Sequence, residues 1–327
     1  MKILHITNMY PYKKKPWYGI FVYNQIESLK RNSKYKIDCY FINGADGKLN
    51  YLKSIIELRK FKNSYDIIHC HHGWCAIIAA LVFKKETKIV SLVGGDLLEK
   101  DIWYKKILVN VTKRVIRKFN HVIVKSENMK RELVNLDLKK ISVIPNGVNL
   151  DLFKPMAQEI CKNEIGIDLK KQYFLFTAAE NGQGRPEKRF DIIDSALKII
   201  NDDDIKVLCM NNINHRDVPK YINSCEAVLM CSDYEGSPNI IKEAMACNVH
   251  IISTDVGNVA EMISGVQSSI IIRQDSKEFA LAIKNIANGK LNNNGISGRQ
   301  KLKDMELDED SIARKILNIY KTFGVKL

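Results

Sequence analysis

The sequence has no long hydrophobic run, and its first residues do not resemble a signal peptide. The longest nearly unbroken apolar stretch covers residues 73–83, whereas a helix that crosses a bilayer needs about 20 residues, so we expect no membrane span. Residues 3–6 (Ile-Leu-His-Ile) follow a single lysine and are too few for the apolar core of a signal peptide. Both absences favour a chain that stays in the cytoplasm.

The sequence also lacks a disulfide framework, an internal repeat and a low-complexity tract. Its eight cysteines include no Cys-x-x-Cys pair, and a length of 327 residues excludes a small disulfide-stapled domain. No repeat of solenoid length is visible. The composition, 46% hydrophobic and 27% charged, is that of an ordinary globular chain long enough for two domains.

Acidic residues are scarce in the first half of the chain only. Residues 1–150 hold 28 Lys and Arg against 12 Asp and Glu, a net charge of +16, whereas the remainder stands at −2. The basic excess therefore belongs to the first half. We expect that half to face an anionic partner, such as a membrane surface, a phosphorylated lipid or nucleic acid.

Short apolar runs alternate with amphipathic segments, which is the pattern of parallel α/β layers, because strands covered on both faces are apolar throughout. The predicted strands cover 3–7, 36–42, 67–70, 88–93, 121–124 and 141–144, then 173–177, 205–210, 227–231, 249–253 and 269–272. The helices predicted in the first half cover 21–30, 52–62, 75–83, 102–118 and 128–135.

A segment rich in turn residues separates the two series of strands. Residues 144–155 contain two prolines and an Asn-Gly pair, so we predict domains at 1–148 and 149–309. Apolar residues at helical spacing predict a last helix over 310–323. Two open α/β sheets that face one another leave a cleft at the carboxyl ends of their strands, where ligands bind.

The loop and helix after the strand at 227–231 offer an anion site. Ser237 is a good N-cap and Pro238 suits the first helical position, so the first turn presents backbone N–H groups to a phosphate. Glu243 lies roughly 8 Å further along the helix axis, which suits a ribose diol better than a phosphate. Glu235 lies on the far side of the cap. A capped surface helix with solvated glutamates explains the same residues about as well.

The loop after the strand at 173–177 is the second candidate. It contains Gly184 and the cations Arg185 and Lys188. A Gly-rich loop with cations between a strand and a helix suits a diphosphate. The chain has neither a Gly-x-Gly-x-x-Gly nor a Walker pattern, and a basic surface turn is the alternative interpretation.

In combination, these motifs resemble the retaining glycosyltransferases of the family 4 type. Glu235 and Glu243 have the E-x7-E spacing of that family. The residues around them are very similar to the family's usual sequence. The other matching segments are 143–148 with 153–155, 185–191, 253–257 with Glu261, and 10–22. The resemblance therefore covers nearly the whole chain.

The resemblance implies an α/β fold of the GT-B type, in which two Rossmann-like domains with parallel sheets face one another across a cleft. The second domain would hold the nucleotide-sugar donor and the first the acceptor, with residues 310–327 packing back on the first. It implies catalytic roles for Glu235 on the transferred sugar and for Arg185 and Lys188 on the diphosphate. The implied donor-binding residues are Gly19, Asn146, Gly184, Ser237, Pro238, Asn239, Ile240 and, on the ribose, Glu243.

The resemblance also implies transfer with retention at the anomeric carbon and without a metal or other cofactor, because cations and helix amides neutralise the leaving diphosphate. Gly19 would let the first domain's backbone approach the donor phosphate. The chain departs from the family at Val93, where a histidine is common, although Asp96 remains and is expected to bind the acceptor. It departs again at the neutral Gln183, so that Arg185 must substitute for the usual arginine.

Residues 69–75 hold three histidines and two cysteines and look like a metal cluster. Neighbouring strand residues point to opposite faces, so His69 and His71 cannot share a site with Cys70. No distant Cys-x-x-Cys or His-x3-His completes a tetrahedral set. We therefore expect no metal, and we place His71 and His72 at a strand end in contact with the acceptor; core or solvated histidines fit as well.

The segment 102–118 combines dense cations with apolar residues. Its apolar stripe consists of Ile107, Leu108, Val111, Val115 and Ile116. Such a helix suits an anionic membrane, with Trp103 and Tyr104 at the interface. An ordinary helix whose stripe faces the core explains the stripe, whereas the cation density favours a membrane-facing surface.

The sequence thus predicts a cytoplasmic glycosyltransferase, peripheral on the inner face of the membrane. It would move a sugar from a nucleotide-diphosphate sugar, with uridine as the nucleotide, to a lipid-linked or growing saccharide in bacterial surface polysaccharide assembly. The alternatives are a sugar-nucleotide epimerase on the same fold, which the paired glutamates disfavour, and a basic nucleic-acid-binding protein. The sequence contains no recognisable nucleic-acid-binding motif, so we expect no nucleic-acid partner.

Overall fold

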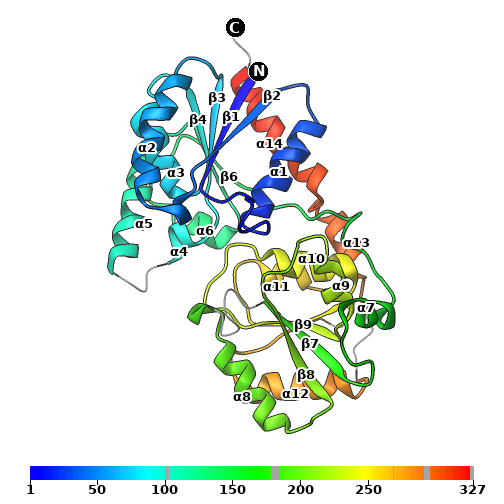
Figure 1. Ribbon diagram of the computed structural model, residues 1–327. Helices are drawn as coiled ribbons and strands as arrows, with labels where there is room; N and C mark the ends of the chain where they lie inside the picture. Colours follow the sequence, from blue (N-terminus) through cyan, green and yellow to red (C-terminus); the bar gives the residue numbers. More distant parts are fainter. Residues whose placement is uncertain (100–102, 178–184, 268, 291–294, 325–327) are drawn as a thin grey trace. The chain divides into compact units, whose positions relative to one another are not determined.

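The chain forms two compact units in a computed structural model that describes residues 1–99, 103–177, 185–267, 269–290 and 295–324 (Figure 1). The first unit comprises Met1–Gly147 and the C-terminal segment from Glu309, and the second comprises Val148–Asp308. The N-terminal segment of the first unit ends at Gly147, one residue before the end predicted from the sequence at residue 148. Among the described residues, no helix is both long and apolar enough to cross a membrane.

Six parallel strands form the sheet of the first unit, in the order β2-β1-β3-β4-β5-β6. The strands are β1 (Lys2–Thr7), β2 (Lys36–Phe41), β3 (Ile67–His71), β4 (Thr87–Ser91), β5 (His121–Val124) and β6 (Ile141–Val143). The helices are α1 (Ile20–Arg31), α2 (Leu49–Leu58), α3 (Gly73–Val82), α4 (Gly95–Leu98), α5 (Trp103–Ile116), α6 (Glu127–Arg131) and α14 (Glu309–Gly324), with 3₁₀ turns η1 (Gly44–Asp46) and η2 (Arg59–Phe61).

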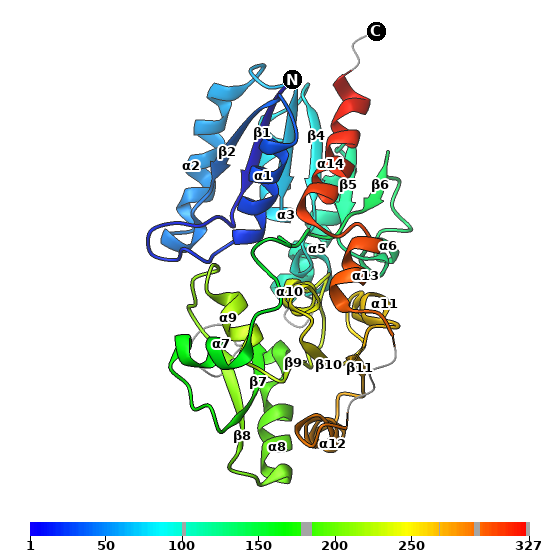
Figure 2. The same ribbon diagram turned by 90° about the vertical axis from the view of Figure 1, so that its right-hand side faces the viewer.

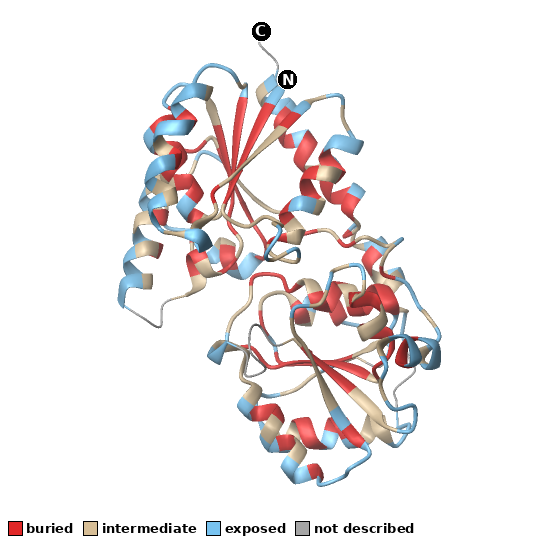
Figure 3. Cartoon of the chain, viewed as in Figure 1, coloured by how far each residue is buried: buried red, intermediate tan, exposed pale blue. Residues whose placement is uncertain are grey.

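Helices cover both faces of this sheet. Helices α1 and α14 pack together on one face, and α2, α3 and α5 lie side by side on the other (Figures 1 and 2). The central strands are therefore buried along their length, as Figure 3 shows. This double cover is the physical reason why the strands consist of nearly continuous apolar runs.

Five parallel strands form the sheet of the second unit, in the order β11-β10-β9-β7-β8. The strands are β7 (Gln172–Thr177), β8 (Ile205–Met210), β9 (Ala227–Met230), β10 (His250–Ser253) and β11 (Ser269–Ile271). The helices are α7 (Gln158–Ile165), α8 (Phe190–Ile200), α9 (Val218–Asn223), α10 (Asn239–Cys247), α11 (Val259–Ile263), α12 (Ser276–Ala287) and α13 (Gly298–Asp304), with the 3₁₀ turn η3 (Pro186–Lys188). Helices α8 and α12 pack together below the sheet in Figure 1, and α10 packs on α9 and α13 above it.

Every predicted strand is confirmed, with its ends displaced by at most two residues. Two predicted helices differ more. The helix predicted at 52–62 begins at Leu49 and gives way after Leu58 to a 3₁₀ turn, which is a common way for a last turn to tighten. The helix predicted at 128–135 ends at Arg131.

The last helix, α14, belongs to the first unit although it follows the second in sequence. Ser28 Oγ on α1 donates hydrogen bonds to the Glu309 carbonyl at 3.1 Å and to Asp310 Oδ1 at 3.0 Å. Near the other end of the helix, Tyr320 is completely buried. The helix is therefore anchored on the first unit at both ends.

Candidate functional site

The start of α10 lies directly after β9, at the carboxyl edge of the second sheet. Its N-cap is Pro238 and not Ser237, so the predicted cap is wrong by one residue. Ser237 instead accepts two hydrogen bonds from Lys242 Nζ, one at its Oγ at 2.9 Å and one at its carbonyl at 3.2 Å. Pro238 has no side-chain acceptor, so it does not compete with an anion for the N–H groups of the first turn.

Lys242 is a buried cation beneath this loop. Its side chain has no solvent exposure, which is rare for lysine and requires polar partners. The ammonium holds Ser237 in place and adds positive charge next to the positive end of the helix dipole. Lys242 is not among the residues predicted from the sequence. The signal that could have identified it is a lysine on a helix face that also holds the buried Ile241 and Ala244.

Two of the three residues predicted to be catalytic meet at this edge. Lys188, from the loop after β7, forms an ion pair with Glu235 Oε1, and Ser232 Oγ donates to the same oxygen at 3.2 Å. The side chains of Lys188 and Glu235 are 14% and 18% exposed, so the pair remains in reach of a ligand. The two loops meet because β7 and β9 are neighbours in the sheet.

The loop that carries Lys188 is fixed by a second cation, Arg189. Its side chain donates to Asp191 at 3.0 Å and to Asp233 at 3.2 Å, and these hydrogen bonds, that to Asp191 foremost, raise the pKa of Arg189 above its usual range. Arg185 is 54% exposed and pairs with its neighbour Glu187 at 3.1 Å, so a ligand can recruit it only by competing with that carboxylate. The predicted donor-binding residue Gly184 lies outside the described residues.

Glu243 lies one turn into α10 and faces a histidine that sequence analysis did not single out. His215 Nε2, from the loop after β8, is 3.5 Å from Glu243 Oε1, and both side chains are about 15% exposed (15% and 14%). The His215 ring packs edge-on against Phe153. The signal that could have identified His215 was its place just after a predicted strand, at the same sheet edge as the other loops.

The loop after β10 completes the second unit's edge. Gly257 has a φ of +64°, and a Cβ there would lie 2.8 Å from the Gly236 carbonyl oxygen, so only glycine permits this approach. A cavity of about 570 Å³ opens beside it, lined by Ser232, Asp233, Thr254, Asp255, Ile271, Ile272, Arg273, Gln274 and Glu278. Three of these are carboxylates, and neither Glu243 nor Lys188 lines the cavity, so a diphosphate fits the start of α10 better.

Gly19, in the first unit, is required by the fold itself. It is the N-cap of α1 with a φ of +65°, and a Cβ there would lie 2.2 Å from the Met9 carbonyl carbon. The close approach is therefore to the chain's own backbone at Met9 and Tyr10. A further approach to a donor phosphate stays a prediction.

Asp96 and Asn146 are both buried, with exposures of 1% and 8%. The Asp96 carboxylate accepts hydrogen bonds from the backbone N–H groups of Gly73, Val93 and Gly94, at 3.0 to 3.2 Å. It organises its own loop, and contact with an acceptor stays a prediction. Close by, burial lowers the pKa of Lys125 to about 8, an effect that Asp96 opposes.

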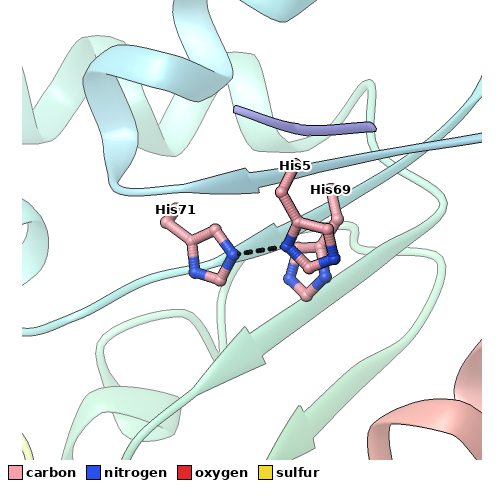
Figure 4. A group of neighbouring side chains, drawn as sticks. All are labelled: His5, His69 and His71. Atoms are coloured by element: carbon pink, nitrogen blue, oxygen red, sulfur yellow. Dashed lines mark hydrogen bonds between the residues drawn. The ribbon is translucent and has the colours of Figure 1, made fainter. Parts of the chain in front are cut away.

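Three buried histidines form a cluster in the first unit. His5 on β1 stands opposite His69 on β3, and His71 follows two residues later on the same face (Figure 4). His5 Nδ1 and His71 Nε2 are 2.9 Å apart, and His69 contacts Tyr320 through Nδ1 and Ser91 through Nε2. The sequence motif contains His69 and His71 but not His5, because the pairing of β1 with β3 is not visible in the sequence.

Burial lowers the pKa of each of these rings, that of His5 to about 3 and those of His69 and His71 well below the usual value. The rings are therefore neutral at pH 7. Their ligand atoms lie within 4.8 Å of one another, but the nitrogens are already engaged in a chain of hydrogen bonds that runs through Tyr320 to His5 Nε2 at 3.3 Å. A metal ion would have to displace this chain, so a structural role fits better.

Of the two histidines predicted to touch the acceptor, His71 is thus 1% exposed and belongs to the cluster. His72 is partly exposed at the N-cap of α3, with a φ of +81°, and its Nδ1 accepts from the Trp74 N–H at 3.2 Å. Of the two, His72 is the one that a ligand can reach.

Comparison with known proteins adds an independent finding. Residues 23–152 match the family model described as Glycosyltransferase Family 4, and residues 180–288 match the model described as Glycosyl transferases group 1. The two matches fall on the first and second units respectively, with only a few residues of overlap across the boundary.

Similar proteins include a putative teichuronic acid biosynthesis glycosyltransferase, TuaC, of Bacillus subtilis, which is 22% identical over 86% of this chain and 88% of its own length. The UDP-Gal:alpha-D-GlcNAc-diphosphoundecaprenol alpha-1,3-galactosyltransferase of Escherichia coli is 26% identical, over 74% of this chain and 72% of its own. Among solved structures, Anabaena HepE in complex with UDP and glucose aligns with a TM-score of 0.75 at 16% identity, covering 98% of this chain and 99% of that one.

Proposed function

Because this chain belongs to glycosyltransferase family 4 and is a glycosyltransferase of the GT-B fold, we propose that it transfers a sugar from a UDP-sugar to a lipid-linked or growing saccharide. The reaction would serve bacterial surface polysaccharide assembly, such as that of a capsule or an O-antigen. The observation that carries the proposal is the meeting of Lys188 and Glu235 beside the start of α10.

The donor site is supported by the chemistry along this edge. The first turn of α10, the ammonium of Lys188 and the buried Lys242 supply positive charge for a diphosphate. One turn further, Glu243 would bind the ribose diol, and His215 lies beside it. The relative from Escherichia coli is named for a UDP-galactose donor, and HepE was solved with UDP and glucose, which favours uridine here.

The proposed chemistry follows from these charges. When the bond between the anomeric carbon and the diphosphate oxygen breaks, negative charge develops on the leaving diphosphate, and fixed cations and helix amides stabilise it. Lys188 is paired with Glu235 before the donor arrives, so the diphosphate would take over the ammonium and free Glu235 for the sugar. With this positive charge available, we propose a reaction that needs no metal ion. Retention of the anomeric configuration is proposed from the resemblance to the retaining family alone.

The acceptor part of the proposal depends on charge and on the relatives. The basic excess of +16 in residues 1–150 favours an anionic surface, and we propose that the protein acts peripherally on the cytoplasmic face of the membrane. One relative is named for a diphosphoundecaprenol-linked acceptor and another for teichuronic acid biosynthesis. Both names fit an acceptor that is a lipid-linked or polymeric saccharide.

The donor site is tested by a thermal-shift series of nucleoside diphosphates and UDP-sugars on the wild type and on Glu243→Ala. A ligand at 100 times its Kd stabilises the native state by about 2.7 kcal/mol. We expect UDP to raise the Tm of the wild type and to lose most of this effect in Glu243→Ala, because the ribose diol loses its acceptor. The matched control is Glu159→Ala, an exposed glutamate on α7, which should respond like the wild type.

A Tm that responds to UDP equally in all three proteins would contradict the assignment of Glu243. Product analysis then separates the enzyme classes. A glycosyltransferase consumes UDP-sugar productively only with an acceptor, and NMR of the product shows whether the anomeric configuration is retained. A changed sugar nucleotide formed without any acceptor would favour the epimerase alternative.

A further inference from the structure

One helical layer of the first unit carries apolar side chains on its outer face. Helices α2, α3 and α5 lie side by side on one face of the sheet (Figures 1 and 3). The exposed large apolar side chains on these helices are Leu49, Leu52, Ile56, Trp74, Leu81, Trp103, Tyr104 and Ile107. We call this set the outer apolar face.

The central helix, α3, has no polar side to turn to solvent. Trp74 and Leu81 are 42% and 56% exposed, and Ile77 lies between them at the same helical phase. The opposite side of α3 is fully buried against the sheet. A helix that is apolar all round is ordinarily covered on every side. The exposed outer side of α3 is therefore a candidate binding surface.

Helix α2 packs on the core through Leu58, which is fully buried, and carries a second row of apolar side chains that is exposed. Leu49, Leu52 and Ile56 follow the i, i+3, i+7 spacing of one helix face, and each is more than 60% exposed. On the inner side, the buried Ser54 donates a hydrogen bond to the Tyr51 carbonyl. The three exposed aliphatic side chains lie outside the core cluster on which α2 packs.

On helix α5, the apolar stripe expected from the sequence does not all face the core. Ile107 does not share the inner face with Ile116; it is 53% exposed, and the buried positions are Val109, Thr112 and Ile116. Trp103, at the start of the helix, is 72% exposed. The aromatic and aliphatic groups at this end of α5 therefore continue the outer apolar face.

The other helical layer of the same unit provides an internal comparison. Among the described residues of α1 and α14, Tyr23 is the one exposed large apolar side chain, with 38% of its surface accessible. Both layers cover the same sheet and carry similar helix lengths, so the difference does not come from the architecture. The apolar surface is a property of the α2–α3–α5 layer.

The three helical segments that carry the outer apolar face are strongly basic. The segments 49–61, 73–85 and 103–118 hold eleven Lys and Arg and a single acidic residue, Glu57, whose carboxylate accepts a hydrogen bond from Tyr40. The exposed cations are Lys53, Arg59, Lys60, Lys84, Lys85, Lys106, Arg114, Arg117 and Lys118. Exposed apolar and aromatic groups on segments that also carry many exposed cations match a surface of anionic phospholipid.

We propose that the outer apolar face docks on an anionic bilayer, with its Leu, Ile and Trp side chains inserted at the boundary between headgroups and acyl chains and its cations on lipid phosphates. This rests on the proposed function insofar as a lipid-linked acceptor is the reason for the enzyme to be there. A second copy of the chain is the weaker occupant, because a symmetric contact would place these cations opposite one another.

The test is flotation of the full chain with phosphatidylcholine vesicles, with and without phosphatidylglycerol, at low and high salt. The apolar variant is Leu52→Ser, Leu81→Ser and Ile107→Ser together, one exposed site on each helix. The matched control is Ile160→Ser, Ile199→Ser and Leu281→Ser, which are exposed apolar residues of the second unit. We expect the apolar variant to bind anionic vesicles at least tenfold more weakly and the control to bind like the wild type.

Fluorescence gives a second readout, since two of the chain's three tryptophans, Trp74 and Trp103, belong to the outer apolar face. In a Trp17→Phe background, anionic vesicles should shift the emission to the blue, and brominated lipids should quench it. Unchanged emission on vesicle-bound protein would overturn insertion and leave adhesion by charge alone, as would equal vesicle binding by the apolar variant.

Two further outcomes would also overturn the proposal. They are a wild type that does not float with anionic vesicles, and a dimer in sedimentation that the apolar variant abolishes. Failure of the proposed function is seen separately in the UDP-induced rise of Tm, which the apolar variant should retain in full. Vesicle binding without any nucleotide effect would keep the docking surface and reject the glycosyl-transfer assignment.

Discussion

At the scale of single residues, the buried ammonium of Lys242 connects the packing of α10 to its ligand chemistry. It donates to both the side chain and the carbonyl of Ser237. Removal of a donor from buried acceptors costs about 1–3 kcal/mol, and here the acceptors belong to the loop that precedes the helix start. The loop's position and the local positive charge therefore depend on one side chain.

We predict that Lys242→Met weakens UDP binding about tenfold, equivalent to about 1.4 kcal/mol, because the Ser237 loop loses its anchor and the site loses a charge. Calorimetric titration of UDP into folded protein measures the Kd directly. Lys198→Met, at an exposed lysine of α8, is the control and should keep the wild-type Kd. An unchanged Kd in Lys242→Met would show that the ammonium serves stability alone.

The histidine cluster leads to a prediction on pH. In the unfolded chain these rings take up protons near pH 6.5. In the folded chain, burial lowers the pKa of His5 to about 3 and the pKa values of His69 and His71 well below the usual value. The unfolded state therefore binds more protons below pH 6.5, and the free energy of unfolding falls as the pH is lowered from 6.5 toward 3. Three such rings contribute a slope of up to about 4 kcal/mol per pH unit.

Urea unfolding at pH 7, 6 and 5 measures this slope. His71→Gln keeps a polar side chain but cannot titrate, so below pH 6.5 its free energy of unfolding should change with pH about a third less steeply than that of the wild type. Above pH 7, this contribution to the pH dependence should be absent from both proteins. Identical slopes in the two proteins would mean that His71 does not resist protonation in the folded state.

At the scale of secondary-structure elements, the neighbours in each sheet decide which residues meet. Because β1 pairs with β3 in parallel, His5 stands opposite His69. Because β7 lies beside β9, the loops that follow them bring Lys188 to Glu235. In both cases the residues come from the same edge or face of two adjacent strands.

Helix α14 is linked to the strands by Tyr320, whose hydroxyl contacts His69 Nδ1 and, at 3.3 Å, His5 Nε2. We predict that Tyr320→Phe destabilises the protein by about 1–3 kcal/mol, because a buried ring nitrogen is left without a partner. Chemical denaturation checks this, with the exposed Tyr104→Phe as the control that should change stability little. A loss no larger than that of the control would show that α14 is held without the hydroxyl.

At the scale of the whole molecule, charge and apolar exposure are distributed unevenly between the two units. The first half carries the whole basic excess, and the first unit also carries the outer apolar face. The second unit carries the loops that we propose bind the donor diphosphate. Under this proposal, one chain combines a unit suited to a surface with a unit suited to a nucleotide-sugar.

Much of the fold was predictable from the sequence, and less of the site. The apolar runs predicted the strands, and the E-x7-E spacing pointed to Glu235 and Glu243 beside a helix start. The sequence did not predict the burial of Lys242 or the engagement of Asp96 by three backbone N–H groups. It also did not predict that Ile107 faces outward.

The alternation of strands and helices, the division into two units and the location of the basic charge could be predicted from the chain alone. Periodicity, turn residues and charge counts are local properties of a sequence. The folded arrangement was needed to show that His5 joins His69 and His71, that Lys188 meets Glu235, and that three neighbouring helices carry the exposed apolar side chains. These contacts depend on which strands and helices become neighbours, and strand order is set by the packing of the whole unit.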